Sequence, residues 1–199
     1  MARPAVKGEH ILQVAGDVFR ELGYAAASMD EIARRAGVAK ATLYRYYPAK
    51  QDLFAAVLEA ARVRWPEQEP QELGDDPEVT LTRILLLGLE RLFEPAYAGL
   101  VRVAAAEARH MPELAATFVQ NVLQPIQAEL HMALVHEQRA GKLRDVDVAV
   151  STRQLIGLCV GYAMPSVLFE VSVPHDGPTL QRVARENART FLYGVLKRT

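Results

Sequence analysis

Cysteine is nearly absent from this chain, whose 199 residues include only one, Cys159. A single thiol excludes an internal disulfide framework and any metal site built from several cysteines. Histidine offers no substitute, because His131 and His136 are five positions apart, a poor spacing for two ligands on one helix. No catalytic triad, nucleotide-binding loop or metalloprotease motif occurs in the sequence. We therefore predict no metal, no cofactor and no enzymatic activity.

Long apolar runs are also lacking. The longest stretch without an acidic or basic residue, 154–169, has 16 residues and contains Pro165. It falls short of the roughly 20 apolar residues that a helix needs to span a bilayer. The first residues, 1–9, contain no apolar region of the kind found in a secretory signal. We therefore expect a cytoplasmic protein with no membrane partner.

A strong excess of one charge is missing too, because the net charge at pH 7 is −1. Such a chain does not coat nucleic acid indiscriminately, so any nucleic-acid site has to be a local patch. Residues 1–64 hold 10 lysines and arginines against 7 acidic residues, whereas residues 65–199 hold 13 against 17. This asymmetry indicates two modules with different partners, although chance fluctuation explains it equally well.

Helical periodicity is what the chain has in abundance. Apolar residues recur three and four positions apart in nearly every segment, and 114–135 is expected to be one long helix kinked at Pro125. The main interruption, 65–78, holds three prolines, one glycine and six acidic residues, and is typical of a linker. The predicted fold class is all-α, with an N-terminal module at 1–64 and a larger helical module at 79–199.

The segment 29–48 has the pattern of a helix-turn-helix. Ser28 followed by Glu31 is typical of a capping box that opens a short helix. Gly37 supplies the positive φ of a tight turn, and Ala33 is small where the two helices must approach closely. Three further residues provide the apolar contacts of the crossing: Ile32, Val38 and Leu43. The N-terminal module is therefore predicted to be a three-helix helix-turn-helix domain.

The second helix of this motif is the predicted recognition helix, placed in the major groove of double-stranded DNA. Cationic side chains reach phosphates or guanine edges there, hydroxyls donate to phosphate oxygens, and methyl groups contact thymine. Lys50, in the first turn of a connecting helix at about 50–64, combines a cation with backbone N–H groups and suits a phosphate. Tyr47 is expected in the core, and plain solvent exposure is the alternative for the other candidates: Lys40, Ala41, Thr42, Tyr44, Arg45 and Tyr46.

Residues 11–58 resemble the N-terminal DNA-binding domain of the TetR/AcrR family of bacterial transcriptional repressors. The resemblance rests on the block Ser28-Met-Asp-Glu-Ile-Ala-Arg-Arg-Ala-Gly-Val-Ala-Lys-Ala-Thr-Leu-Tyr-Arg-Tyr-Tyr-Pro-Ala-Lys-Gln-Asp-Leu-Phe. It implies that DNA contacts come from Thr42, Tyr44, Tyr46 and Lys50, with contributions from Ser28, Met29, Lys40 and Ala41.

The C-terminal module is similar to an AcrR/AefR-like subgroup in two stretches, Arg109-His-Met-Pro-Glu-Leu-Ala and Gly141-Lys-Leu-Arg-Asp-Val-Asp. This similarity implies an effector-binding and dimerisation domain. Effector candidates are polar or aromatic side chains in apolar surroundings, for each of which a surface or core role is the alternative. These candidates are Arg102, His110, Phe118, Asn121, Gln124, His131 and Tyr162.

The last two predicted helices suit a homodimer. Residues 155–163 are apolar on nearly every side, so a helix there has to bury several faces. Together with the final helix, which Asp176 opens, two copies would form a four-helix bundle. The alternative is that both helices belong to the core of a single chain.

The sequence therefore predicts a homodimeric transcriptional repressor that a small-molecule effector, of unknown identity, releases from a palindromic operator. In this mechanism the effector favours one conformation of the C-terminal module, and the connecting helix changes the spacing of the two recognition helices. Two alternatives stay open. One is a helical enzyme, for which no convergent catalytic groups are found, and the other is a protein–protein adaptor with a helix-turn-helix fold that binds no operator.

Overall fold

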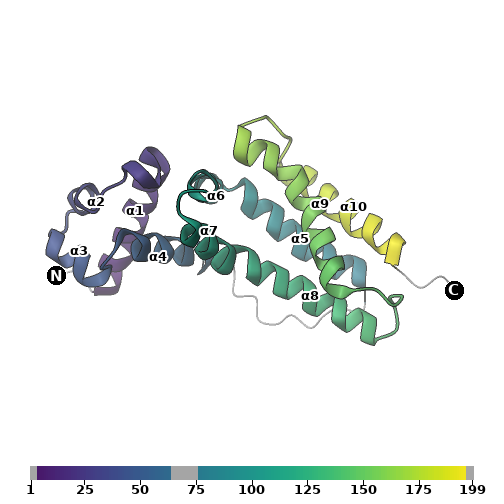
Figure 1. Cartoon of the computed structure of the whole chain (residues 1–199). Helices are drawn as coiled ribbons and strands as arrows, with labels where there is room; N and C mark the ends of the chain where they lie inside the picture. The colour runs from purple at the N-terminus through teal and green to yellow at the C-terminus, as the bar shows by residue number, and fades with distance from the viewer. Residues whose placement is uncertain (1–3, 64–75, 196–199) are drawn as a thin grey trace. The chain divides into compact units, whose positions relative to one another are not determined.

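The computed structural model describes residues 4–63 and 76–195, except for the side chains of residues 4–7, 62, 63, 121 and 122. These residues form ten α-helices and one π-helical segment (Figure 1). No β-strand occurs among them, which confirms the all-α prediction. No helix in the described ranges is both long and apolar enough to cross a membrane.

The chain divides into two compact units, and the first contains the predicted helix-turn-helix. Its members include three segments from the middle of the chain as well as the N-terminal helices. The elements are α1 (Pro4–Ala26), α2 (Met29–Arg35), α3 (Lys40–Tyr46), α4 (Lys50–Val63), α6 (Pro95–Glu107), α7 (Pro112–Phe118) and the π-helical segment η1 (Val119–Leu123).

An aromatic cluster holds α1 against α4 in this unit. Phe19 and Phe54 are fully buried, with ring centroids 5.1 Å apart in an edge-to-face arrangement. Tyr24 packs on both, at 5.6 Å from Phe19 and 5.4 Å from Phe54. Buried aromatic pairs of this geometry add to the hydrophobic gain of burial. The end of α1 is therefore anchored firmly to α4.

A glycine lets α1 approach α6 closely. The side chain of Arg20 lies across Gly99, where a Cβ would overlap its Cγ and Cδ atoms. From this position the guanidinium of Arg20 pairs with Asp17, one turn earlier on α1. Only a residue without a side chain leaves room for the aliphatic part of this arginine.

The second unit is made of four long helices: α5 (Pro77–Phe93), α8 (Gln124–Arg139), α9 (Val148–Phe169) and α10 (Gly177–Val195). Ala184 and Ala188 on α10 are fully buried in its hydrophobic core, beside leucines of α5 such as Leu81 and Leu89. Small residues one helical turn apart allow two helix axes to approach closely. The N-termini of α5, α9 and α10 are each capped by an aspartate, whose side chain accepts a hydrogen bond from an amide in the first turn.

Two expected segments, a long helix and a linker, have different outcomes. The chain is helical without a break through the expected long helix at 114–135, but its irregularity is not a kink at Pro125: α7 ends at Phe118, the π-helical turn η1 follows it, and α8 begins at Gln124. The expected linker at 65–78 lies mostly outside the described residues, which resume with Asp76 as the N-cap of α5. The division into functional modules at 1–64 and 79–199 stays a prediction.

Candidate nucleic-acid interface

The start of α2 is fixed by its N-cap. Ser28 has an extended backbone, and its Oγ accepts a hydrogen bond from the amide of Glu31 at 3.1 Å. This is one half of the predicted capping box. The other half differs, because the Glu31 carboxylate binds Arg34 and Arg35 further along the helix. A single serine therefore sets where α2 begins.

A tight turn then leads from α2 into α3. Gly37 has a φ of 64°, a left-handed conformation that favours glycine. The amide of Val38 donates to the carbonyl of Ala33 at 3.0 Å, which closes the turn. Ile32 on α2 and Leu43 on α3 are fully buried. These features form the predicted helix-turn-helix.

Leu43 is the buried residue of α3, and most of the other side chains face outward. Thr42 is half-buried, whereas Tyr44 and Tyr46 are 40% and 50% exposed. The predicted core residue Tyr47 is half-buried, and burial raises its pKa. The remaining exposed residues of α3 are Lys40, Ala41 and Arg45. This helix therefore presents hydroxyls, methyl groups and cations together on its surface, the mixture that reads DNA.

The cations of α3 differ in their partners. Lys40 forms an ion pair with Asp30, with 2.7 Å between Nζ and Oδ1, and its ammonium is 5.9 Å from the ring centre of Tyr44. The hydrogen bond to Asp30 raises the pKa of Lys40. The guanidinium of Arg45 lies 5.3 Å from the ring centre of Tyr46. An exposed ion pair such as Lys40–Asp30 contributes little stability.

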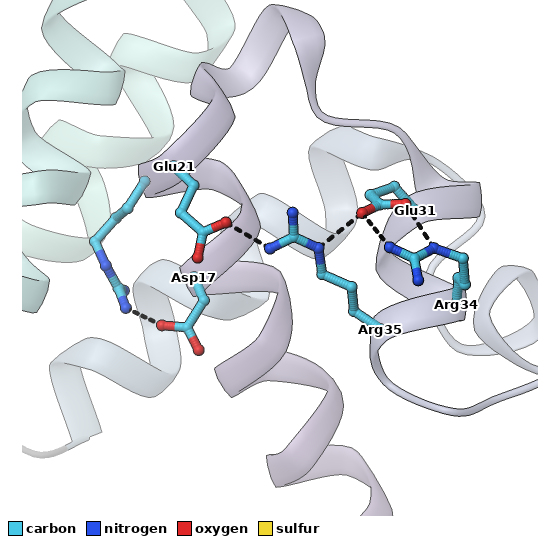
Figure 2. A network of polar contacts seen from close by, with 6 residues as sticks. Asp17, Glu21, Glu31, Arg34 and Arg35 are labelled. Atoms are coloured by element: carbon cyan, nitrogen blue, oxygen red, sulfur yellow. Dashed lines mark hydrogen bonds and ion pairs between the residues drawn. The ribbon is translucent and has the colours of Figure 1, made fainter.

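The arginines of α2 are held by an acidic network (Figure 2). Glu31 accepts hydrogen bonds from Nε and Nη2 of Arg34, at 2.9 and 2.7 Å, and from Nε of Arg35 at 2.7 Å. Arg35 also reaches Glu21 on α1, at 2.5 Å. The hydrogen bonds that Glu31 accepts from Arg34 and Arg35 lower the pKa of Glu31 to about 2. The network therefore links α2 to α1.

Two of the predicted DNA-contacting residues, Met29 and Lys50, do not share the exposed position of the α3 side chains. The side chain of Met29 is 6% exposed and belongs to the core. The ammonium of Lys50 donates to backbone carbonyls at the end of α1. A residue that the sequence reasoning missed lies beside it: Asp52 accepts a hydrogen bond from the amide of Ala49 at 2.9 Å. Its spacing of three residues is the signal of a capping side chain.

The predicted effector residues are distributed over both units. In the first unit, Arg102 is half-buried and His110 is exposed, and the ring of Phe118 lies 6.4 Å from that of Tyr97. Asn121 belongs to η1, and its side chain lies outside the described residues. The structure does not gather this set within one unit.

The other effector candidates belong to the second unit. Gln124 and His131 are exposed on α8. Tyr162 is half-buried and packs on Phe93, with 6.2 Å between ring centres, while its hydroxyl donates to the carbonyl of Pro174 at 2.6 Å. Tyr162 therefore has an internal partner.

Two family descriptions match the chain. Residues 11–57 match "Bacterial regulatory proteins, tetR family", and residues 79–194 match "AefR-like transcriptional repressor, C-terminal domain". The second match alone covers more than half of the chain, and the first contains α2, α3 and the start of α4.

Individual proteins agree with these matches. The HTH-type transcriptional activator FasR of Mycolicibacterium smegmatis is 51% identical over 49 residues, which are 25% of this chain and 22% of that protein. An uncharacterized HTH-type transcriptional regulator of Mycobacterium bovis is 28% identical over 145 residues, or 70% of this chain and 71% of that protein. The solved structure of the flavonoid-responsive regulator FrrA is 26% identical, with a TM-score of 0.81 over 98% of this chain and 100% of that chain.

The lowered pKa of Glu31 predicts a pH dependence of stability. Between the ordinary value of 4.5 and about 2, the unfolded chain binds more protons at this site than the folded chain does. The stability that Glu31 contributes is therefore complete above pH 4.5 and is lost as the pH falls toward 2. We expect the side-chain carbon signal of Glu31 in an NMR titration to move with a midpoint near 2. Replacing both Arg34 and Arg35 by glutamine should raise the midpoint, and a wild-type midpoint near 4.5 would contradict the assignment.

Proposed function

The chain belongs to the TetR family of bacterial DNA-binding transcriptional regulators, and we propose that it is a repressor that leaves its operator when a small-molecule effector binds. The operator is a palindrome read by a homodimer, and the protein works in the cytoplasm. The description of the C-terminal match as that of a repressor supports the direction of control. FasR, by contrast, is named an activator, but its similarity extends over only 49 residues, 25% of this chain.

The observation that carries this proposal is the outward face of α3. A helix of this kind fits the major groove of B-DNA, where its side chains reach base edges and phosphates. Ala41 and the methyl group of Thr42 suit thymine methyl groups, while Arg45 suits a guanine edge or a phosphate. The residues that we propose to contact DNA through side chains are Ser28, Lys40, Ala41, Thr42, Tyr44, Arg45 and Tyr46. The buried side chain of Met29 leaves only its backbone for a DNA contact.

The exposed side of α9 supports the homodimer. Val150 and Leu158 are 48% and 39% exposed, and Gly157 and Gly161 lie on the same side of the helix. Apolar side chains beside two glycines allow a second helix to pack closely against this side. Two copies joined through α9 and α10 would present two recognition helices to two half-sites.

The effector is a small molecule that the C-terminal module would bind. The residues predicted to contact it are Arg102, His110, Phe118, Asn121, Gln124, His131 and Tyr162. The hydroxyl of Tyr162 would have to leave Pro174 to donate a hydrogen bond to the effector. FrrA is flavonoid-responsive by its name, so planar polyphenols are the first compounds to test.

Selection from a random duplex pool tests the operator. We expect the enriched duplexes to share a palindrome whose half-sites are about one helical turn apart, since each recognition helix reads one half-site. Fluorescence anisotropy should then show two protomers bound to each duplex. An enriched sequence without internal symmetry would contradict the palindrome, and the absence of any enrichment would favour the adaptor alternative.

Arg45 distinguishes an operator-binding protein from an adaptor. We expect Arg45→Ala to reduce the slope of log affinity against log salt by about 0.9 for each phosphate that is no longer neutralised. Arg139→Ala removes an exposed arginine from α8, in the other unit and outside the proposed dimer helices, and is the matched control. Equal slopes and equal affinities for the wild type, Arg45→Ala and Arg139→Ala would remove Arg45 from the interface.

The effector prediction is tested on the same complex. A true effector is expected to weaken operator binding by about 5- to 150-fold, the usual range for coupling between two sites. Flavonoids are titrated first into the complex of the protein with its selected duplex, and anisotropy reports release. A flavonoid that leaves the affinity unchanged at saturating concentration is excluded as an effector.

A further inference from the structure

The α9–α10 loop, residues 170–176, lies against aromatic side chains of its own unit. The imidazole of His175 stacks on the ring of Phe93, with 4.8 Å between the ring centres and 3° between the ring planes. The ring of Tyr162 meets Phe93 edge-on, and its hydroxyl donates to the carbonyl of Pro174 at 2.6 Å. The loop therefore places one flat ring and one hydrogen-bond acceptor on an aromatic platform, which Phe93 of α5 and Tyr162 of α9 form.

Both ends of this loop are fixed through the backbone of the helices it joins (Figure 1). Glu170 follows α9 in a left-handed conformation, with a φ of 56°, and its amide donates to the carbonyl of Ser166 at 3.1 Å. At the other end, Asp176 caps α10 by accepting hydrogen bonds from the amide and the hydroxyl of Thr179, at 2.9 and 3.0 Å. The middle of the loop can therefore leave the aromatic platform without unfolding either helix.

The contacts in the middle of the loop are of a kind that a ligand can replace. Pro174 and His175 are exposed, so water already competes for the carbonyl and the imidazole, and their transfer to solvent costs little. Nδ1 of His175 lies 2.8 Å from the carbonyl oxygen of Val173, a contact within the loop that moves with it. Phe93 and Tyr162, by contrast, are half-buried and packed against the hydrophobic core. They would be left with exposed aromatic surface, which a second flat ring covers well.

We propose that the α9–α10 loop is an internal pseudo-ligand for the effector, an inference that rests on the effector binding of the proposed function. The effector carries a planar aromatic ring, which replaces the imidazole of His175 on Phe93. It also carries a hydrogen-bond acceptor, which receives the hydroxyl of Tyr162 in place of the carbonyl of Pro174. A polycyclic aromatic compound with hydroxyl or carbonyl groups has both features, whereas a saturated fatty acid lacks the ring.

The loop and the effector compete for one surface in this arrangement. The effector binds only those molecules whose loop is open, so its apparent affinity is reduced by the fraction that is open. Replacing His175 weakens the hold of the loop and therefore strengthens effector binding. If His175 were itself a contact of the effector, the same substitution would weaken binding instead. The sign of the change thus separates a competitor from a contact.

Quercetin, a planar polyhydroxylated flavonoid, is titrated into the full chain without DNA, and calorimetry gives its dissociation constant. We expect His175→Ala to bind quercetin about 2- to 10-fold more tightly than the wild type, because loss of one aromatic stack raises the open fraction by a factor of this order. His136→Ala removes another exposed histidine, in the last turn of α8, and is expected to bind quercetin like the wild type.

Two further titrations test the platform and the class of ligand. In the His175→Ala background the loop no longer stacks on Phe93, so adding Phe93→Leu removes only the stack made by the effector. This second substitution should weaken quercetin binding by about 2- to 10-fold. Decanoic acid, a saturated fatty acid, is expected to gain no affinity from His175→Ala.

The outcomes separate this inference from the proposed function. Quercetin that binds His175→Ala no more tightly than the wild type overturns the pseudo-ligand role of the loop, and so does quercetin that binds neither protein. Decanoic acid that gains as much affinity as quercetin overturns the assignment to an aromatic ring. Because these titrations contain no DNA, quercetin that binds as expected but leaves the operator complex intact supports the site and contradicts release by that compound.

A measurement on the native chain decides the matter if a variant does not fold. The ring current of Phe93 is expected to shift the ring-proton signals of His175 upfield in the NMR spectrum of the free protein. Saturating quercetin should move these signals toward the positions typical of an exposed histidine, while those of His136 stay in place. His175 signals that do not change when calorimetry shows quercetin to be bound would overturn the proposal.

Discussion

The left-handed backbone at Gly37 is the constraint on which the candidate interface depends. With a φ of 64° the chain ends α2 and turns back within a few residues, so α3 begins at Lys40. Ile32 and Leu43 then meet in the core on either side of the turn. The direction in which α3 presents its polar residues follows from this turn, and a side chain at position 37 would strain it.

Several cationic side chains of the N-terminal helices bind partners within the protein. Arg34 and Arg35 share Glu31, and Lys50 is bound to carbonyls of α1. Counting cations along the sequence therefore overstates how many of them are free to contact DNA directly. The cations of α3 that remain at the surface are Lys40, with an exposed partner, and Arg45, stacked beside a tyrosine. Recognition by this domain consequently depends on position more than on total charge.

Sequence reasoning identified the elements better than it identified the partners of the side chains. The helix-turn-helix at 29–48 and the apolar helix around 155–163 follow from local patterns, and the cap of α2 follows from Ser28, because each signal lies within a few residues. Lys50 and its carbonyls are more than twenty positions apart, a contact that no local pattern encodes. The π-helical turn before Pro125 also escaped prediction, since proline is the stronger local signal of a break.

The contact between Arg20 and Gly99 has a consequence for how this protein changes over evolutionary time. The two residues are far apart in the chain, yet the stem of the arginine occupies the space where any side chain at position 99 would begin. An alanine there would require Arg20 to adopt another rotamer or to be replaced by a shorter residue, so substitutions at the two positions are coupled. Homologous chains are thus expected to carry a record of this packing as correlated substitutions between α1 and α6.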